Sequence, residues 1–206
     1  KKEIEAFLSH LATQGKVSAS TQRQALNGII FLYRDVLDMT VEGQIEPVRA
    51  KRHPHLPVVM TQAEVRRVLA EMQGVHLLMA KLLYGSGLRL MECIRLRVQD
   101  LDFERALLYI RSAKGGKDRT TLFPKSIHED MRNHSIKVKR RHEEDLSHGY
   151  GEVYMPEALE RKYRNASREL RWQYVFPAKK LSVDPRTRIM RRHHTLESGL
   201  QKAVKA

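Results

Sequence analysis

Cysteine and long apolar runs are what this 206-residue sequence most clearly lacks. Its single cysteine, Cys93, excludes a disulfide within the chain and leaves too few thiolates for a cysteine-built zinc site. No stretch approaches the roughly 18 apolar residues of a membrane-spanning helix. The first residues, KKEIEAFLSH, also lack the apolar segment of a secretory signal. We therefore expect a cytoplasmic protein that makes no membrane contact.

Negative charge is also scarce. The sequence has 38 Lys and Arg but 24 Asp and Glu, which gives a formal net charge of +14 at pH 7. Such an imbalance favours polyanionic partners, because a protein that neutralises phosphates releases the counterions condensed on a nucleic acid. With 41% hydrophobic residues the chain can bury a core, and its length fits one whole domain with part of another.

The first 40 residues predict two amphipathic helices. Apolar residues recur at helical spacing from Ile4 to Leu11 and again from Leu26 to Leu37, with the polar QGKVSAS between them. Two helices enclose little core, so we interpret residues 1–40 as the C-terminal part of a helical domain. Residues 41–59 carry three prolines and a basic cluster, and are predicted to be a linker.

Residues 60–206 predict a domain that is mainly α with a small β-hairpin. Thr61 and Glu64 have the pattern of a capping box, in which a hydroxyl and a carboxylate each bond a backbone amide at a helix start. A second apolar helix ends at the GSG of residues 85–87. The β-prone runs ALLYI and RTTLFP flank RSAKGGKD, whose glycines permit a tight turn. A long polar helix, a shorter helix, a possible strand at WQYVFP and a final helix should follow.

Two of these segments resemble a known family. YGSGLRLMECIRLRVQDLDF (Tyr84–Phe103) and IRSAKGGKDRTTLFP (Ile110–Pro124) are similar to the first conserved box and the β-hairpin of tyrosine recombinases, the phage-integrase-type enzymes. The resemblance implies the N-terminal portion of an α+β catalytic domain at 60–206, preceded by part of a helical, SAM-like core-binding domain. It also implies an enzyme that breaks and rejoins DNA through a 3′-phosphotyrosine, without a metal or other cofactor.

Arg89 and Lys114 match the catalytic residues of these two segments. In the family the arginine of the GLR motif holds the scissile phosphate, and Glu92 matches an acidic residue usual three places on. A guanidinium suits the role, because it donates two parallel hydrogen bonds to phosphate and keeps its charge. The hairpin lysine of the family protonates the departing 5′ oxygen, which Lys114 would do here. Lys117 is a rival for this role, since AKGGKD offers two lysines.

The segment at about 148–194 resembles the insertion that distinguishes integron integrases from other tyrosine recombinases. In that group the insertion holds bases that protrude from a folded single strand of the cassette recombination site. The matching positions here are Trp172, Pro185, His193 and His194. An unpaired base offers a face on which such rings can stack, worth roughly 1–3 kcal/mol per base for an aromatic side chain.

Each of these residues also has an ordinary structural interpretation. An arginine at a helix start is usually solvated, a lone tryptophan is usually a core residue, and the histidine pair could belong to a solvated basic helix. We prefer the functional interpretation because the motifs occur together in the family's order. Further basic residues are candidate phosphate contacts: Arg49, Lys51, Arg52, Lys117, Arg119, Arg188, Arg191 and Arg192. No metal site is expected, because adjacent histidines on a helix diverge by about 100° and no other ligand falls at a familiar spacing.

Later parts of the family pattern do not occur in these 206 residues. Complete tyrosine recombinases continue with a His-x-x-Arg box, a further His or Trp, and the nucleophilic tyrosine. Seven tyrosines occur, but we interpret none as the nucleophile. The sequence starts with Lys and stops inside an expected helix, so we expect an incomplete copy that binds DNA weakly and cannot cleave it.

Three hypotheses about function remain open. The first is a recombinase that works as a homotetramer on DNA recombination sites, integrates and excises gene cassettes, and has no small-molecule substrate. The second is a non-catalytic, DNA-binding remnant of such an enzyme. The third is a structural helical protein whose charge only aids solubility, for which any DNA binding would lack a steep dependence on salt.

Overall fold

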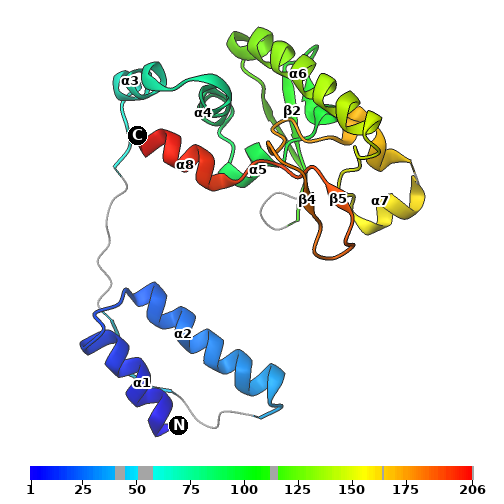
Figure 1. Cartoon of the computed structure of the whole chain (residues 1–206). Helices are drawn as coiled ribbons and strands as arrows, with labels where there is room; N and C mark the ends of the chain where they lie inside the picture. The colour runs from blue at the N-terminus through cyan, green and yellow to red at the C-terminus, as the bar shows by residue number, and fades with distance from the viewer. Residues whose placement is uncertain (40–44, 51–57, 112–115, 164, 206) are drawn as a thin grey trace. The chain divides into compact units, whose positions relative to one another are not determined.

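The computed structural model describes residues 1–39, 45–50, 58–111, 116–163 and 165–205 (Figure 1). The chain divides into two compact units, Lys1–Val59 and Met60–Ala206. Among the described residues, no helix is both long and apolar enough to cross a membrane.

The first unit is a pair of helices with the segment that follows them. α1 spans Lys2–Thr13, α2 spans Ala19–Phe31, and a π-helical turn covers Leu32–Val36. Ser18 caps α2, because its hydroxyl oxygen accepts a hydrogen bond from the Thr21 amide at 3.2 Å. The predicted helix pair is confirmed.

Gln22 joins both helices to residues 45–50. Its Nε2 donates to the carbonyl oxygens of Leu8 and Val48 at 2.8 and 2.7 Å, and its Oε1 accepts from the Ala50 amide at 3.0 Å. Leu8 and Gln22 are the only buried residues in the described part of this unit. Residues 45–50 of the predicted linker therefore pack back on the helices.

The second unit is mainly helical, and its described residues form two small antiparallel sheets, which confirms the predicted fold class. Its helices are α3 (Gln62–Glu71), α4 (Gly74–Ser86), α5 (Leu90–Ile94), α6 (His128–Ser147), α7 (Glu157–Lys162) and α8 (Glu197–Lys205). Its strands are β1 (Leu101–Asp102), β2 (Leu107–Ile110), β3 (Arg119–Leu122), β4 (Ser182–Val183) and β5 (Met190–Arg191). Short 3-10 turns lie at Val98–Asp100, Lys125–Ile127, Ala166–Arg168 and Leu170–Trp172.

The first helix boundaries in this unit follow the expected chemistry. The Thr61 hydroxyl accepts from the Glu64 amide at 3.3 Å, and the Glu64 carboxylate accepts from the Thr61 amide at 2.7 Å. This is the predicted capping box. α4 ends at Gly87, whose φ of 61° is a left-handed conformation that a glycine adopts without steric cost.

The main core lies between the helices and the three-stranded sheet, whose order is β1-β2-β3. Leu108 and Ile110 point inward from β2, while alternate residues are more exposed, as expected for a strand with one buried face. Met79 and Leu82 of α4 are fully buried against this layer. α8 packs on α4 and adds Leu200 to the same core (Figure 1).

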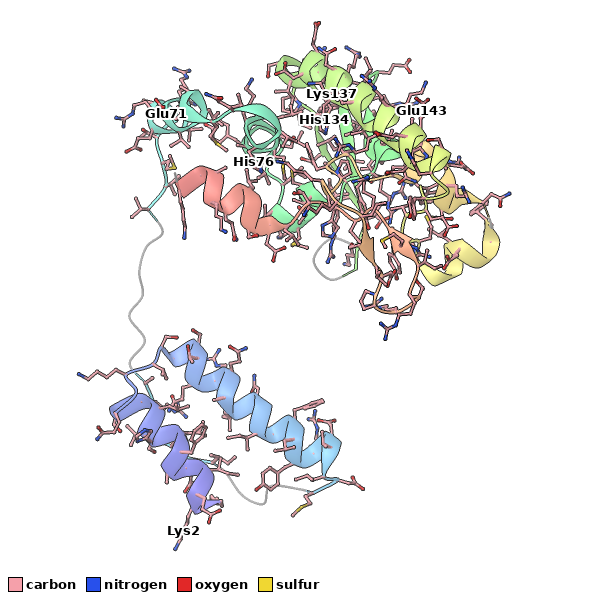
Figure 2. All side chains as sticks on the ribbon, in the orientation of Figure 1. Lys2, Glu71, His76, His134, Lys137 and Glu143 are labelled. Atoms are coloured by element: carbon pink, nitrogen blue, oxygen red, sulfur yellow. The ribbon has the colours of Figure 1, made fainter. Side chains whose placement is uncertain are left out.

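α6 has a buried face, although its sequence is mostly polar. Met131 and Val138 are buried, and His134 points toward the core, where its Nε2 lies 2.7 Å from the Val175 carbonyl oxygen; Lys137 is exposed (Figure 2). Val175 belongs to WQYVFP, for which the sequence indicates a strand. That expectation is wrong: the segment makes isolated β-bridges instead of a strand, although Val175 and Phe176 are core residues.

Candidate functional site

Arg89 stands at the sharp junction between α4 and α5. Gly87 ends α4, and Arg89 is the residue in extended conformation that precedes α5. Behind the junction, a Cβ added to Gly85 would lie 2.5 Å from Cγ of Pro124, so only glycine fits there. The backbone is thus closely held while the Arg89 side chain stays 59% exposed.

Glu92 links Arg89 to Arg119. Its Oε1 accepts from Arg89 Nη1 at 2.8 Å, and its Oε2 accepts from Arg119 Nη2 at 2.7 Å and from the Arg89 backbone amide at 2.8 Å. Burial raises the pKa of this carboxyl, but the hydrogen bonds from Arg89 and Arg119 outweigh it, so the pKa lies below the ordinary value of a glutamate. One carboxylate therefore orients two guanidinium groups, and the cluster keeps a net positive charge.

The β2–β3 hairpin carries the other predicted catalytic group. Ile110 pairs with Arg119 where the two strands end, and Lys117 is exposed just before β3. Lys114, the expected general acid, lies outside the described residues, as do the two linker cations Lys51 and Arg52.

A pocket of about 710 Å³ opens beside Arg89. Its wall includes all four residues of the insertion segment that were predicted to hold a base: Trp172, Pro185, His193 and His194. The fold therefore brings together five candidate residues that are up to 105 positions apart in the sequence.

The rest of the pocket wall is rich in guanidinium and aromatic groups. Its arginines are Arg89, Arg95, Arg97, Arg111 and Arg186, and its tyrosines are Tyr109, Tyr154 and Tyr174. Three acids, Glu92, Asp100 and Asp184, accompany them. Guanidinium groups suit phosphates and aromatic rings suit bases, so this combination fits a nucleotide.

Trp172 is a core residue as well as part of the pocket wall. It is 9% exposed and packs with Val153, Met155, Ala166 and Tyr174 in a second, smaller core. Its buried Nε1 has no hydrogen-bond partner among the described residues. The ordinary interpretation of a lone tryptophan thus describes most of its surface, and only a small part of the ring is open to a ligand.

Arg191 and Arg192 are engaged in ion pairs. The Arg191 side chain is 1% exposed, with Nη1 3.2 Å from Asp184 Oδ2 and Nη2 3.7 Å from Glu160. Arg192 donates from Nε and Nη2 to both carboxylate oxygens of Asp145. Both arginines therefore have structural partners inside the fold, and the phosphate contacts predicted for them stay predictions.

His193 and His194 follow β5 and are not part of a helix, contrary to the solvated basic helix considered above. Burial lowers the pKa of His193; Asp184 raises it, and electrostatic interactions with His194 and Arg191 lower it. The His194 ring meets Tyr174 edge-on, with 5.2 Å between ring centroids. Within the described ranges, no group of three or more His, Cys, Asp or Glu residues could hold a metal ion.

Residues 58–206 match the model of the Phage integrase family, and residues 1–42 match that of the Phage integrase, N-terminal SAM-like domain. The chain belongs to the phage integrase family. The tyrosine-recombinase resemblance of the two motifs is thereby confirmed at the level of the family.

The proteins to which the chain is similar are named as recombinases. It is 41% identical over 203 residues to proteins named Integrase/recombinase from Escherichia coli and Pseudomonas aeruginosa, which covers 98% of the chain and 60% of each relative. It is 34% identical over 131 residues to Tyrosine recombinase XerA of Thermococcus kodakarensis, covering 61% of the chain and 45% of that protein. A crystal structure of XerA recombinase shares 23% identity and a TM-score of 0.38, over 68% of this chain and 49% of that one. The chain thus spans about three fifths of the first two relatives.

Two arginines that the sequence did not indicate, Arg97 and Arg111, also line the pocket. Arg97 donates from Nη1 and Nη2 to the carbonyl oxygens of Trp172 and Tyr154, and its guanidinium lies 4.8 Å from the centre of the Tyr174 ring. Arg111 is held by Asp100 at 2.8 Å. The only signal was the position of Arg111, just before the predicted hairpin turn.

Proposed function

We propose that this chain is the phosphate-binding part of a site-specific tyrosine recombinase of the integron-integrase kind. The observation that carries the proposal is the pocket where Arg89 meets Trp172, Pro185, His193 and His194. Membership of the phage integrase family and the 41% identity to proteins named Integrase/recombinase support it.

Arg89 would bind the scissile phosphate. Its side chain is exposed and one edge is held by Glu92, so the remaining N–H groups can donate to two phosphate oxygens. The same groups would stabilise the charge that grows as the phosphorus is attacked, which is the usual source of acceleration in such sites. Glu92 would act as a positioning residue, since its carboxylate accepts hydrogen bonds from Arg89 and Arg119.

The strand-transfer step needs a nucleophile and an acid. A tyrosine hydroxyl gives its proton to a general base, to which we assign no residue of this chain, and its oxygen bonds to phosphorus while the bond from phosphorus to the 5′ oxygen breaks. That oxygen takes a proton from Lys114 of the hairpin, with Lys117 as the alternative donor, and leaves a 3′-phosphotyrosine and a free 5′ hydroxyl. Attack by another 5′ hydroxyl reverses the step and rejoins the DNA. We assign no tyrosine of these 206 residues as the nucleophile.

The remainder of the pocket would take a base that protrudes from a folded DNA strand. Pro185, in the turn after β4, and His193, just after β5, both line it, and both present a ring on which a base can stack. The substrates would be cassette recombination sites, and the working form would be a homotetramer on DNA.

Binding to shaped DNA tests this proposal. Fluorescence anisotropy would compare a DNA hairpin that carries protruding bases with the same hairpin fully paired. We expect roughly tenfold tighter binding to the first, from about 1–3 kcal/mol per stacked base. His193→Ala and Pro185→Ala should remove this preference, whereas Lys180→Ala, an exposed cation outside the pocket, should keep it.

Two outcomes would count against the proposal in different ways. Equal binding of both hairpins by the unmodified chain would contradict the integron-integrase assignment and leave the recombinase assignment standing. Binding that does not weaken with salt would contradict the recombinase assignment as well, because phosphate contacts require that dependence.

A non-catalytic DNA-binding remnant is the second candidate. It would give the same binding data, since it keeps the pocket and the positive charge. The reading frame distinguishes the two: a His-x-x-Arg box and a downstream tyrosine after Ala206 support the enzyme, and an immediate stop codon supports the remnant.

A further inference from the structure

Arg111, like Arg89, is an exposed arginine paired with a nearly buried carboxylate, although no motif indicates it. It follows the last residue of β2 and lines the same pocket. Its Nε donates to Oδ1 of Asp100 at 2.8 Å, and its side chain is 52% exposed while that of Asp100 is 4% exposed. A nearly buried carboxylate therefore holds one edge of a guanidinium whose other end reaches solvent.

Asp100 is itself fixed. Its Oδ2 accepts from the Arg97 backbone amide at 2.9 Å, within the short turn Val98–Asp100 that leads into β1. Arg97 and Arg111 both interact electrostatically with this carboxylate. Asp100 thus faces two guanidinium groups, as Glu92 does, and each of these two clusters carries a net positive charge.

The other arginines of the pocket are built differently. Both terminal nitrogens of Arg97 are engaged by backbone carbonyl oxygens, so it cannot turn toward a ligand. Arg95 and Arg186 form no ion pair with a carboxylate within the described residues, so nothing fixes their orientation in the same way. Only Arg89 and Arg111 combine pocket exposure with a fixed carboxylate behind them.

We propose that Arg111 is a second phosphate-binding residue of this site and contacts a backbone phosphate other than the one held by Arg89. A guanidinium fixed at Nε presents its terminal N–H groups in a defined direction, which suits a phosphate oxygen. The proposal rests on the proposed function only in taking DNA as the ligand.

The test measures how DNA affinity of the 206-residue chain varies with salt. A labelled 20-base-pair duplex would be titrated at several salt concentrations. Arg111→Gln keeps an N–H donor for Asp100 but removes the charge, so we expect the slope of log affinity against log salt to fall by about 0.9, the contribution of one phosphate contact. Arg111→Lys should keep most of the slope and lose affinity by a few-fold, because lysine lacks the fork.

Arg105 provides a matched control. It also pairs with an aspartate, with Nη1 3.2 Å from Asp102 Oδ2, and it is 70% exposed, but it does not line the pocket. Arg105→Gln should leave the slope unchanged, whereas Arg89→Gln should reduce it. Thermal unfolding of each variant would establish that the chain is folded at the assay temperature.

The possible outcomes separate this inference from the function on which it rests. If Arg89→Gln lowers the slope and Arg111→Gln does not, or if Arg105→Gln lowers it equally, the role of Arg111 is refuted while DNA binding stands. If the unmodified chain shows no salt-dependent binding, the proposed function fails first and the inference fails with it.

Discussion

At the scale of single residues, Glu92 determines how Arg89 is held. Its folded-state pKa lies below 4.5, so its ionised form stabilises the fold fully above about pH 4.5. That contribution is lost as the pH falls through the depressed folded-state pKa. Glu92→Gln removes the charge at every pH. We therefore expect a lower Tm than wild type at neutral pH, with a difference that shrinks below about pH 4.5.

Circular dichroism melts over this pH range measure the effect. Glu104→Gln is the control, because Glu104 is an exposed carboxylate on the turn between β1 and β2. Its difference from wild type should stay small throughout. A Glu92→Gln difference that grows on acidification would show that the sign of the pKa shift is wrong.

The roles of single residues could be predicted from the sequence only where the residues belong to a recognisable motif. Arg89 and Glu92 could be located because a helix start places them three positions apart, within reach of each other. The burial of Arg191 could not be foreseen. Its partners, Asp184 and Glu160, are set by the fold and by no local spacing, so an arginine in a basic stretch reads as a surface residue.

At the scale of elements, the capping box of α3 is a feature that the sequence predicts completely. Thr61→Ala removes the oxygen that accepts from the Glu64 amide. We expect a loss of about 1 kcal/mol of unfolding free energy, or roughly 2–4 °C in Tm for a chain of this size. Gln62→Ala, an exposed substitution in the first turn of the same helix, should change Tm by much less. Similar melting of both variants would argue against the cap.

The β4–β5 hairpin depends on Arg191. Asp184 is nearly buried at its turn, and Arg191→Met would leave that carboxylate without its partner at 3.2 Å. We expect Arg191→Met to lower Tm by several degrees, and Arg188→Met, at an exposed position of the same hairpin, to have little effect. Differential scanning calorimetry distinguishes them. Equal Tm values would mean that the buried ion pair is dispensable.

Element prediction failed where tertiary contacts override local preference. WQYVFP is β-prone, but the Val175 amide donates to the Leu96 carbonyl oxygen, and on either side of it the segment makes only isolated β-bridges, at Tyr174 and Pro177. α6 was predicted as a polar helix, and two of its polar residues, His142 and Asp145, lie on its buried face. His142 lies 2.9 Å from the Arg168 carbonyl oxygen, and Asp145 binds Arg192, so both polar groups are satisfied inside.

At the scale of the whole molecule, the two units differ in how much core they possess. The second unit holds both apolar clusters, the pocket and most of the +14 net charge. The described part of the first unit buries only Leu8 and Gln22. The sequence indicated this contrast, because two helices cannot enclose a core by themselves. It could not indicate that residues 45–50 would pack on them through Gln22.

This contrast predicts that the second unit is sufficient for stability and for most DNA binding. We expect the fragment Met60–Ala206 to unfold cooperatively with a Tm close to that of the whole chain, since its buried clusters are internal to it. Its affinity for duplex DNA should fall with salt nearly as steeply, because few of the excess positive charges are removed. The fragment Lys1–Val59 should show no cooperative melt. A cooperative melt of Lys1–Val59 would contradict the prediction for that unit, and loss of the transition from Met60–Ala206 would mean that its fold depends on the first unit. A much shallower salt dependence in Met60–Ala206 would mean that DNA binding requires both units.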